Sequence, residues 1–446
     1  MRWIWGAMVL ATACGPDDVA GDGSTGSSGT TAGSSGVGNA TTDDGVDTTA
    51  TPTGDGSSDS STGEPPALCE PGCAVQMVEQ WAYLSADPRA LQGLTALADG
   101  SVAVVERTAF GKAGQSSALV LTTLSADGLP QGTTTVQDPC EACFSVAFAT
   151  QSETPGHVRL VAAQQMGADL LPFVAQIDLV AMDVVWIDSW VMPRRIGSAS
   201  PLGSLVSLAG ETSIVPVRVQ ADLVDLVHHD ATGMRTVATS FAVEPSLLGS
   251  AARPAVRTST ALAVGSVETD DVEGGRVRVL DTATFQPTHE VELDGAPQGL
   301  GALPDGGWVA AYGTGVPGGM ETTVHVVAHD VDGAPSWTSQ FVVPNQGTTH
   351  YLGVLPDTDG TMVVWIRHSY EFTQGMAIEP IPVTTYVGLD AQGQQQWMQE
   401  LDVGEVSWPG LDPSLSRTPS GAVLVGDTVQ VPAARVRSLV PECVCR

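Results

Sequence analysis

The residues best suited to chemistry in this 446-residue chain are its seven cysteines. Cys140 and Cys143 have the C-x-x-C spacing of a redox pair or of half a zinc site. A redox pair of this kind starts a helix that lowers a thiol pKa, but the sequence after Cys143, FSVAFAT, is typical of a strand. A structural disulfide is therefore the favoured interpretation. A zinc site that adds Cys69 and Cys73 is the alternative.

The eight histidines form no metal-binding or catalytic signature. His325 and His329 have the i, i+4 spacing that chelates a metal on a helix, but VHVVAHD has the pattern of a strand. Four strand residues span about 13 Å, which is too far for one ion. His228 and His229 are adjacent, so a strand sends their rings to opposite faces. We expect both pairs to be packing or surface residues.

Carboxylates are the remaining candidates for chemistry. The acidic stretch 268–273 and the turn Asp357-Thr358-Asp359 could bind calcium, but neither matches the twelve-residue loop of an EF-hand. We interpret both as solvated surface loops. A Gly-x-Ser-x-Gly elbow and a phosphate-binding glycine loop are also lacking. The sequence thus assigns no catalytic residue, metal ligand or cofactor site.

Residues 1–13 have the layout of a secretory signal peptide, in which Arg2 precedes an apolar stretch and then small residues. The apolar stretch is shorter than the about 20 residues that span a bilayer. Its end, Ala11-Thr12-Ala13-Cys14, resembles the lipobox of bacterial lipoproteins. The resemblance implies lipidation of Cys14, a membrane anchor, and a place in the cell envelope, at an outer membrane facing the periplasm or the cell surface. Secretion with a free or disulfide-bonded Cys14 is the alternative.

The number of cysteines supports export. An odd number would leave one free thiol in an oxidising compartment. Assigning Cys14 to lipid leaves six candidates for disulfides, which permit three bonds and fifteen connectivities. They are Cys69, Cys73, Cys140, Cys143, Cys443 and Cys445. An oxidising compartment also argues against a zinc site.

Residues 15–66 contain almost only Gly, Ser, Thr, Asp, Ala and Pro. Such a segment cannot bury enough apolar surface to offset its conformational entropy, so residues 14–66 are predicted to be a lipidated, disordered linker with a span of about 40 Å.

The chain carries a net charge of −32. Without the nine acids of the linker and without Arg2, 41 acidic and 17 basic residues remain, which gives the folded part a net charge of −24. This charge excludes nucleic acid as a partner.

From residue 67 onward, apolar runs alternate with Gly, Pro and Asp turns, and two units recur. The first unit is a turn followed by a strand that is apolar at consecutive positions, as expected for burial on both faces. Its copies are 94–107, 151–163, 207–219, 256–266, 300–313, 353–367 and 416–427. The second unit is a strand, a turn and a strand that often carries Trp. Its copies are 121–136, 174–191, 226–243, 277–293, 327–343 and 387–403.

The second unit resembles the PQQ-like, quinoprotein-type β-propeller repeat, most closely in VGLDAQGQQQWMQELDV at 387–403. The resemblance covers most of residues 74–446 and implies that residues 67–446 form an all-β propeller. Quinoprotein dehydrogenases use adjacent cysteines, calcium and an acidic base around their cofactor. This chain has no adjacent cysteine pair, so we predict that it binds no quinone cofactor.

One copy of each unit makes a four-stranded blade, and seven first units indicate seven blades, with six or eight as alternatives. The missing seventh outer strand is expected at 78–84, and pairing of 75–84 with 434–440 would close the ring. Closure would bring the cysteines of both chain ends together. A disulfide there would close a loop of about 370 residues, an effect of order 5 kcal/mol. Local cysteine pairs are the alternative.

Three functions fit these features. The first is a monomeric binding or structural module that recognises a protein or glycan at the propeller face. The second is a propeller enzyme, a hydrolase or quinoprotein-like protein, with catalytic residues on loops of different blades. The third is an envelope scaffold for the assembly of outer-membrane proteins, as in some lipoprotein propellers.

Overall fold

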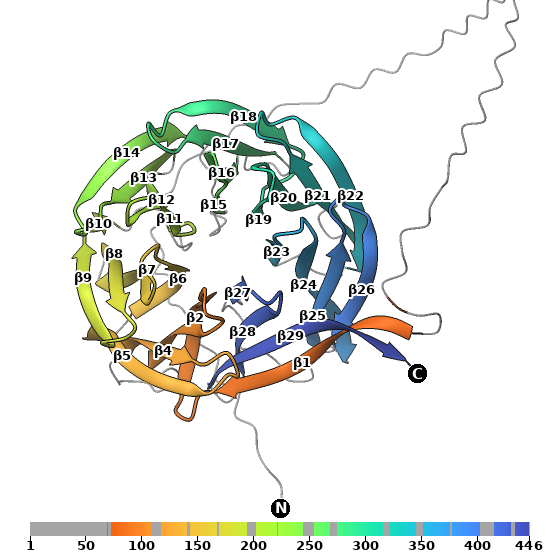
Figure 1. The fold of residues 1–446 in the computed structure, drawn as a ribbon, viewed down its shortest axis with the longest axis horizontal. Coiled ribbons are helices and arrows are strands. Elements are labelled where there is room, and N and C mark those ends of the chain that lie inside the picture. Colours follow the sequence, from red (N-terminus) through yellow and green to blue (C-terminus); the bar gives the residue numbers. More distant parts are fainter. Residues whose placement is uncertain are drawn as a thin grey trace, which may run out of the picture. The chain divides into compact units, whose positions relative to one another are not determined.

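The computed structural model describes a closed ring of seven antiparallel sheets (Figure 1). The described residues are 69, 73–108, 117–140, 143–166, 169–193, 202–220, 222–243, 254–267, 274–314, 321–344, 351–374, 377–401, 414–429 and 433–445. Residues 1–13, Cys14 and the linker to residue 66 lie outside them. Within these ranges, no helix is long and apolar enough to cross a membrane. Seven blades are confirmed, and the alternatives of six or eight are excluded.

The first four blades follow one another along the chain. Blade 1 contains β2 (Arg89–Ala96), β3 (Val102–Thr108), β4 (Ser117–Leu124) and β5 (Pro130–Cys140). Blade 2 contains β6 (Cys143–Gln151), β7 (His157–Met166), β8 (Asp169–Asp178) and β9 (Asp183–Ser189), with β10 (Met192–Pro193) beside β8. Blade 3 contains β11 (Val206–Leu208), β12 (Thr212–Gln220), β13 (Leu223–His229) and β14 (Arg235–Ala242). Blade 4 contains β15 (Ala255–Arg257), β16 (Ala261–Val267), β17 (Gly275–Asp281) and β18 (Pro287–Leu293).

The last three blades complete the ring. Blade 5 contains β19 (Gly299–Ala302), β20 (Trp308–Thr314), β21 (Glu321–His329) and β22 (Pro335–Pro344). Blade 6 contains β23 (Tyr351–Pro356), β24 (Met362–Gln374), β25 (Ala377–Leu389) and β26 (Gln395–Leu401). Blade 7 contains β27 (Ser414–Arg417), β28 (Val423–Val429), β29 (Ala433–Cys445) and, from the other end of the chain, β1 (Cys73–Leu84).

The strands of one blade differ in burial according to their position. The second strand is buried on both faces, and all seven residues of β28 are buried. The outer strand β9 alternates between exposed and half-buried residues, because only one of its faces packs against other sheets. The core lies between neighbouring blades; Val105 and Leu119 of blade 1 pack with Leu160 and Phe173 of blade 2.

Rings on the outer strands join neighbouring blades. Trp337 of blade 5 lies against Gly393, in the turn between the third and fourth strands of blade 6. Gly393 has a φ of +77°, and a Cβ at this position would overlap the indole ring. The position therefore requires glycine for two reasons, its backbone conformation and its lack of a side chain. The same contact joins Trp81 to Gly128, Trp186 to Gly233 and His289 to Gly333.

The ring closes as the sequence predicts. β1 pairs with β29 in antiparallel register, from Cys73 opposite Cys445 to Leu84 opposite Arg435. The register shifts between Glu79 and Trp81, where β1 has a bulge. The expected pairing of 75–84 with 434–440 is confirmed, and the ladder also extends beyond it to the cysteines.

Candidate functional site

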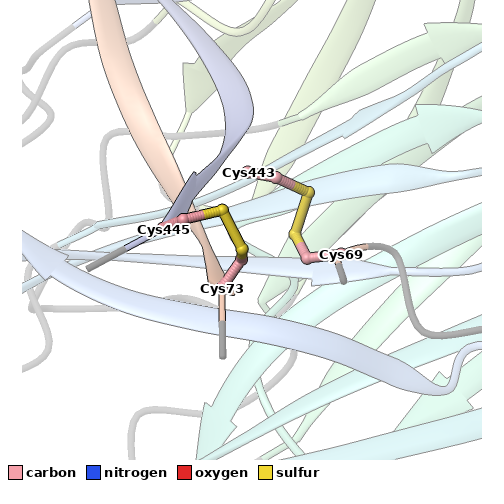
Figure 2. Close-up of a disulfide and its surroundings, with 4 residues drawn as sticks. All are labelled: Cys69, Cys73, Cys443 and Cys445. Carbon is pink, nitrogen blue, oxygen red and sulfur yellow. A yellow bond between two sulfur atoms is a disulfide. The ribbon is translucent and has the colours of Figure 1, made fainter. Parts of the chain in front are cut away.

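Two disulfides lie side by side where the two ends of the chain meet (Figure 2). They join Cys69 to Cys443 and Cys73 to Cys445, with Cα–Cα distances of 5.5 and 4.1 Å. The prediction that closure brings these four cysteines together is confirmed, and the alternative of local pairs among them is excluded. In the other blades a turn joins the third strand to the fourth. In blade 7 the disulfides are the only covalent connection between these strands that the structure describes.

Cys140 and Cys143 occupy the connection between blades 1 and 2. Cys140 is the last residue of β5 and Cys143 is the first residue of β6. The backbone before and after the C-x-x-C motif is therefore extended rather than helical, as the sequence predicts. The side chains of both cysteines lie outside the part of the chain that the structure describes, so the disulfide proposed for them stays a prediction.

A cavity of about 300 Å³ lies among the inner strands of the blades. Gly93, Gly299 and Gly353 contribute backbone to its wall, and its polar side chains are Gln92, Gln298, Ser204 and Ser414. None of the described residues that line it carries a charge. A lining of amides and hydroxyls can hydrogen-bond a neutral polar molecule, whereas proton transfer at this site would need a titratable group.

This cavity, which we call the axial cavity, has acceptors from two glutamines in its wall. Gln92 is buried and donates from its side-chain amide to the carbonyl oxygen of Leu91 at 3.0 Å. The side-chain oxygens of Gln92 and Gln298 have no hydrogen-bond partner among the described residues. Both glutamines begin the same sequence pattern, Gln-Gly-Leu-x-Ala-Leu, which runs into the first units of blades 1 and 5. This repetition could have identified them from the sequence.

The histidines are packed into the blades. His229 is fully buried, with a ring nitrogen 3.2 Å from Oδ2 of Asp188 and its ring stacked on Trp186. Burial lowers the pKa of His229 to about 4, so its ring is neutral at physiological pH. His329 stacks on Trp308 with ring centroids 4.1 Å apart. These contacts identify both rings as core residues.

A buried carboxylate that sequence reasoning missed lies beside the closing strand. Glu106 is fully buried and accepts hydrogen bonds from Arg89 at 2.7 Å, Thr122 at 2.7 Å and Tyr83 at 3.2 Å. Burial and the neighbouring Glu106 raise the pKa of Tyr83. Because Tyr83 belongs to β1, the contact links the closing strand to blade 1. The feature of the sequence that could have identified it is a glutamate directly after the apolar run 102–105.

The acidic residues at the turns have local structural partners. Asp357 forms an ion pair with Arg417 at 2.7 Å. Asp359 accepts hydrogen bonds from the hydroxyl and amide of Thr361, which lower its pKa. Within the described ranges, no three His, Cys, Asp or Glu residues are grouped so that they could hold a metal ion. The second calcium candidate, residues 268–273, lies outside those ranges.

No known protein family and no curated protein matches the sequence. Similar solved structures include a member of the DUF4221 family from Bacteroides vulgatus, 8% identical, covering 83% of this chain and 99% of that chain with a TM-score of 0.42. An alpha-L-arabinofuranosidase from Fusarium graminearum is 12% identical, with coverages of 82% and 98% and a TM-score of 0.45. A europium-containing methanol dehydrogenase is 8% identical, with coverages of 82% and 93% and a TM-score of 0.41. At these values, none of them bears on what this chain binds.

Proposed function

We propose that this chain is an exported lipoprotein whose propeller acts as a binding module of the cell envelope. The pair of disulfides at the closure is the observation that carries the proposal. Bonds of this kind form and persist in oxidising compartments. Export requires a signal, and residues 1–13 have the layout of one. Lipid on Cys14 would then anchor the propeller through the linker to residue 66.

The axial cavity supports binding over catalysis. Its described lining offers amide oxygens, hydroxyls and backbone groups, as at Gln92, Ser204 and Gln298. Such groups orient a polar ligand by hydrogen bonds, and the closed ring holds them rigidly. The lining residues within the described ranges supply neither a general base nor a nucleophile activated by one.

The anchor is tested by replacing the lipidated cysteine. We expect Cys14→Ser to abolish incorporation of labelled fatty acid and to move the protein from the membrane fraction to the soluble fraction. Cys140→Ser is the matched control, because it removes a cysteine without touching the lipobox. A Cys14→Ser protein that keeps the label or stays with the membrane would overturn the anchor.

The binding role is tested separately from the anchor. We expect the purified protein to show no turnover in hydrolase and oxidoreductase assays. The double variant Gln92→Ala, Gln298→Ala is expected to keep the melting temperature of the parent within a few degrees. A reproducible activity of the parent that this variant loses would identify an enzyme instead.

A further inference from the structure

The boundary between blades 6 and 7 lacks a contact that other boundaries have. Trp337 of blade 5 lies against Gly393 in a turn of blade 6, and three further boundaries repeat this arrangement. Blade 7 has no corresponding turn, because its third strand β29 and its fourth strand β1 come from opposite ends of the chain (Figure 1). Trp397, the outer-strand ring of blade 6, lies instead over Gly388, its cross-strand partner.

A cavity of about 510 Å³ lies at this boundary. The β1–β29 ribbon contributes Val75, Pro441 and Cys443 to its wall. Met362 and Leu389, both buried, contribute an apolar surface from blade 6. The half-buried Trp397 also lines the cavity. The cavity therefore combines apolar walls and an indole with openness to solvent, the combination that lets a ligand bury an apolar stem.

The charged groups that line this cavity are predominantly negative. Asp359, Asp390 and Glu442 contribute carboxylates. Arg417 is the one cation among the described lining residues. It is already engaged, since it pairs with Asp357 at 2.7 Å and donates to the carbonyl oxygen of Leu355 at 3.0 Å. Arg417 also lowers the pKa of Asp359 through its charge, so among the described lining residues Asp390 and Glu442 carry the excess negative charge of the cavity.

Asp390 and Glu442 accept hydrogen bonds from neutral donors. Oδ1 of Asp390 accepts hydrogen bonds from the backbone amides of Gln392 and Gln394 at 2.9 and 2.8 Å. Glu442, on the exposed ribbon, accepts one from the side-chain amide of Gln80 at 2.9 Å. Hydrogen bonds from neutral donors orient a carboxylate and leave its charge in place.

We propose that this cavity binds an organic cation, an ammonium or guanidinium group carried on an apolar stem. The inference deepens the proposed binding role and rests on it. A cation near an indole face and carboxylates gains cation–π and Coulombic attraction, and the apolar wall formed by Met362 and Leu389 accommodates the stem. The net charge of −24 on the folded part attracts cations over a longer range.

The test uses the full chain and two probes of the same shape. n-Butylguanidinium carries the charge, and n-butylurea is its neutral counterpart. We expect saturable binding of butylguanidinium by calorimetry, at least about tenfold tighter than binding of butylurea and weakened by salt. Equal affinity for both probes, or no saturable binding of butylguanidinium, would overturn the proposal.

Matched variants locate the site. Trp397→Ala is expected to weaken butylguanidinium binding about tenfold, whereas Trp186→Ala, which removes the outer-strand indole of blade 2, leaves binding unchanged. Glu442→Gln is expected to weaken binding about threefold, and Glu292→Gln, at an exposed carboxylate of blade 4, is its control. Equal losses in the members of either pair would contradict the assignment. Because Glu442 is exposed, its variant keeps the site testable if Trp397→Ala fails to fold.

A peptide probe distinguishes the two sources of such a cation. Tighter binding of acetyl-Gly-Arg-Gly-amide than of butylguanidinium would support a side chain of a partner protein, and equal binding would support a free small-molecule cation. Membrane anchoring is measured independently by the Cys14→Ser variant. Failure of the cation site with the anchor intact therefore overturns this inference alone, whereas failure of the anchor alone leaves the cation site standing.

Discussion

Buried charges in this propeller occur with specific partners on neighbouring strands. Arg159 is fully buried and donates two hydrogen bonds to the side-chain oxygen of Gln176, at 3.0 and 2.9 Å. Arg278 donates to Glu290 at 2.9 Å and to Ser266 at 2.9 Å. Removing one partner of such a group leaves the other desolvated and unpaired, which costs more than the net value of the pair. These residues are therefore sensitive positions in the core.

Glu106 tests how much one buried ion pair contributes to stability. We expect Glu106→Gln to lower the free energy of unfolding by about 3 kcal/mol, because Arg89 keeps its position but loses the buried charge opposite it. Urea unfolding followed by tryptophan fluorescence measures the loss. Glu292→Gln is the control, since this side chain is 83% exposed where it pairs with Arg276. Equal stabilities of the two variants would show that the buried ion pair contributes nothing.

His229 makes stability depend on pH. Its folded-state pKa is about 4, below the about 6.5 of an unfolded histidine. Between these values the unfolded chain binds a proton that the folded protein does not, so stability falls as pH falls from about 6.5 to 4. Leucine occupies the equivalent positions before the turn aspartates, at Leu280 and Leu389. We expect His229→Leu to flatten the decrease in melting temperature over this range; an unchanged slope would assign the decrease to other groups.

At the scale of elements, the outer-strand rings and turn glycines join one blade to the next. We expect Gly393→Ala to lower stability by about 3 kcal/mol, about 1 from the positive φ and about 2 from overlap with Trp337. Gly210→Ala is the control, because Gly210 has a φ of +71° and no atom within 4 Å of a new Cβ. Chemical denaturation of both variants separates the two costs. Equal losses would mean that Trp337 moves aside freely.

The turns could be predicted from the sequence because their causes are local. An aspartate such as Asp230 accepts amide hydrogen bonds within its own turn, from Thr232 and Met234, and Gly233 supplies the positive φ. Other features depend on distant segments and gave no local signal. Phe285 has a φ of +56° and Met182 a φ of +52° in the turn where four other blades have glycine. The short strand β10 forms only because β8 extends beyond β9.

At the scale of the whole molecule, the closure could be predicted by counting units. The sequence has seven first units but only six second units, so the outer strand of the seventh blade had to come from another part of the chain. The disulfide partners were not predictable, because they depend on a register set across 372 and 374 residues and on the bulge between Glu79 and Trp81. The cavity beside Trp397 was hidden for the same reason. It lies where the β1–β29 ribbon of blade 7 meets blade 6, and only the assembled ring reveals this meeting.

The two disulfides are expected to be strongly non-additive. Once Cys69–Cys443 joins the chain ends, Cys73–Cys445 closes only a short additional loop in the unfolded chain. In the chain-entropy model the first crosslink contributes of order 5 kcal/mol and the second about 2. Either pairwise Cys→Ser variant should therefore lose about 2 kcal/mol, because the other bond still closes the large loop.

The variant that lacks all four cysteines should lose more than the sum of the two pairwise variants, about 7 kcal/mol in all, since only then does the unfolded chain regain the freedom of its ends. Urea unfolding of the three variants and the parent measures this cycle. Exposure at Cys443 and Cys445 makes reduction a parallel route to the same state. An additive cycle would mean that each bond stabilises the folded ribbon locally, and that the 73–84 strand holds the ring closed without help from either.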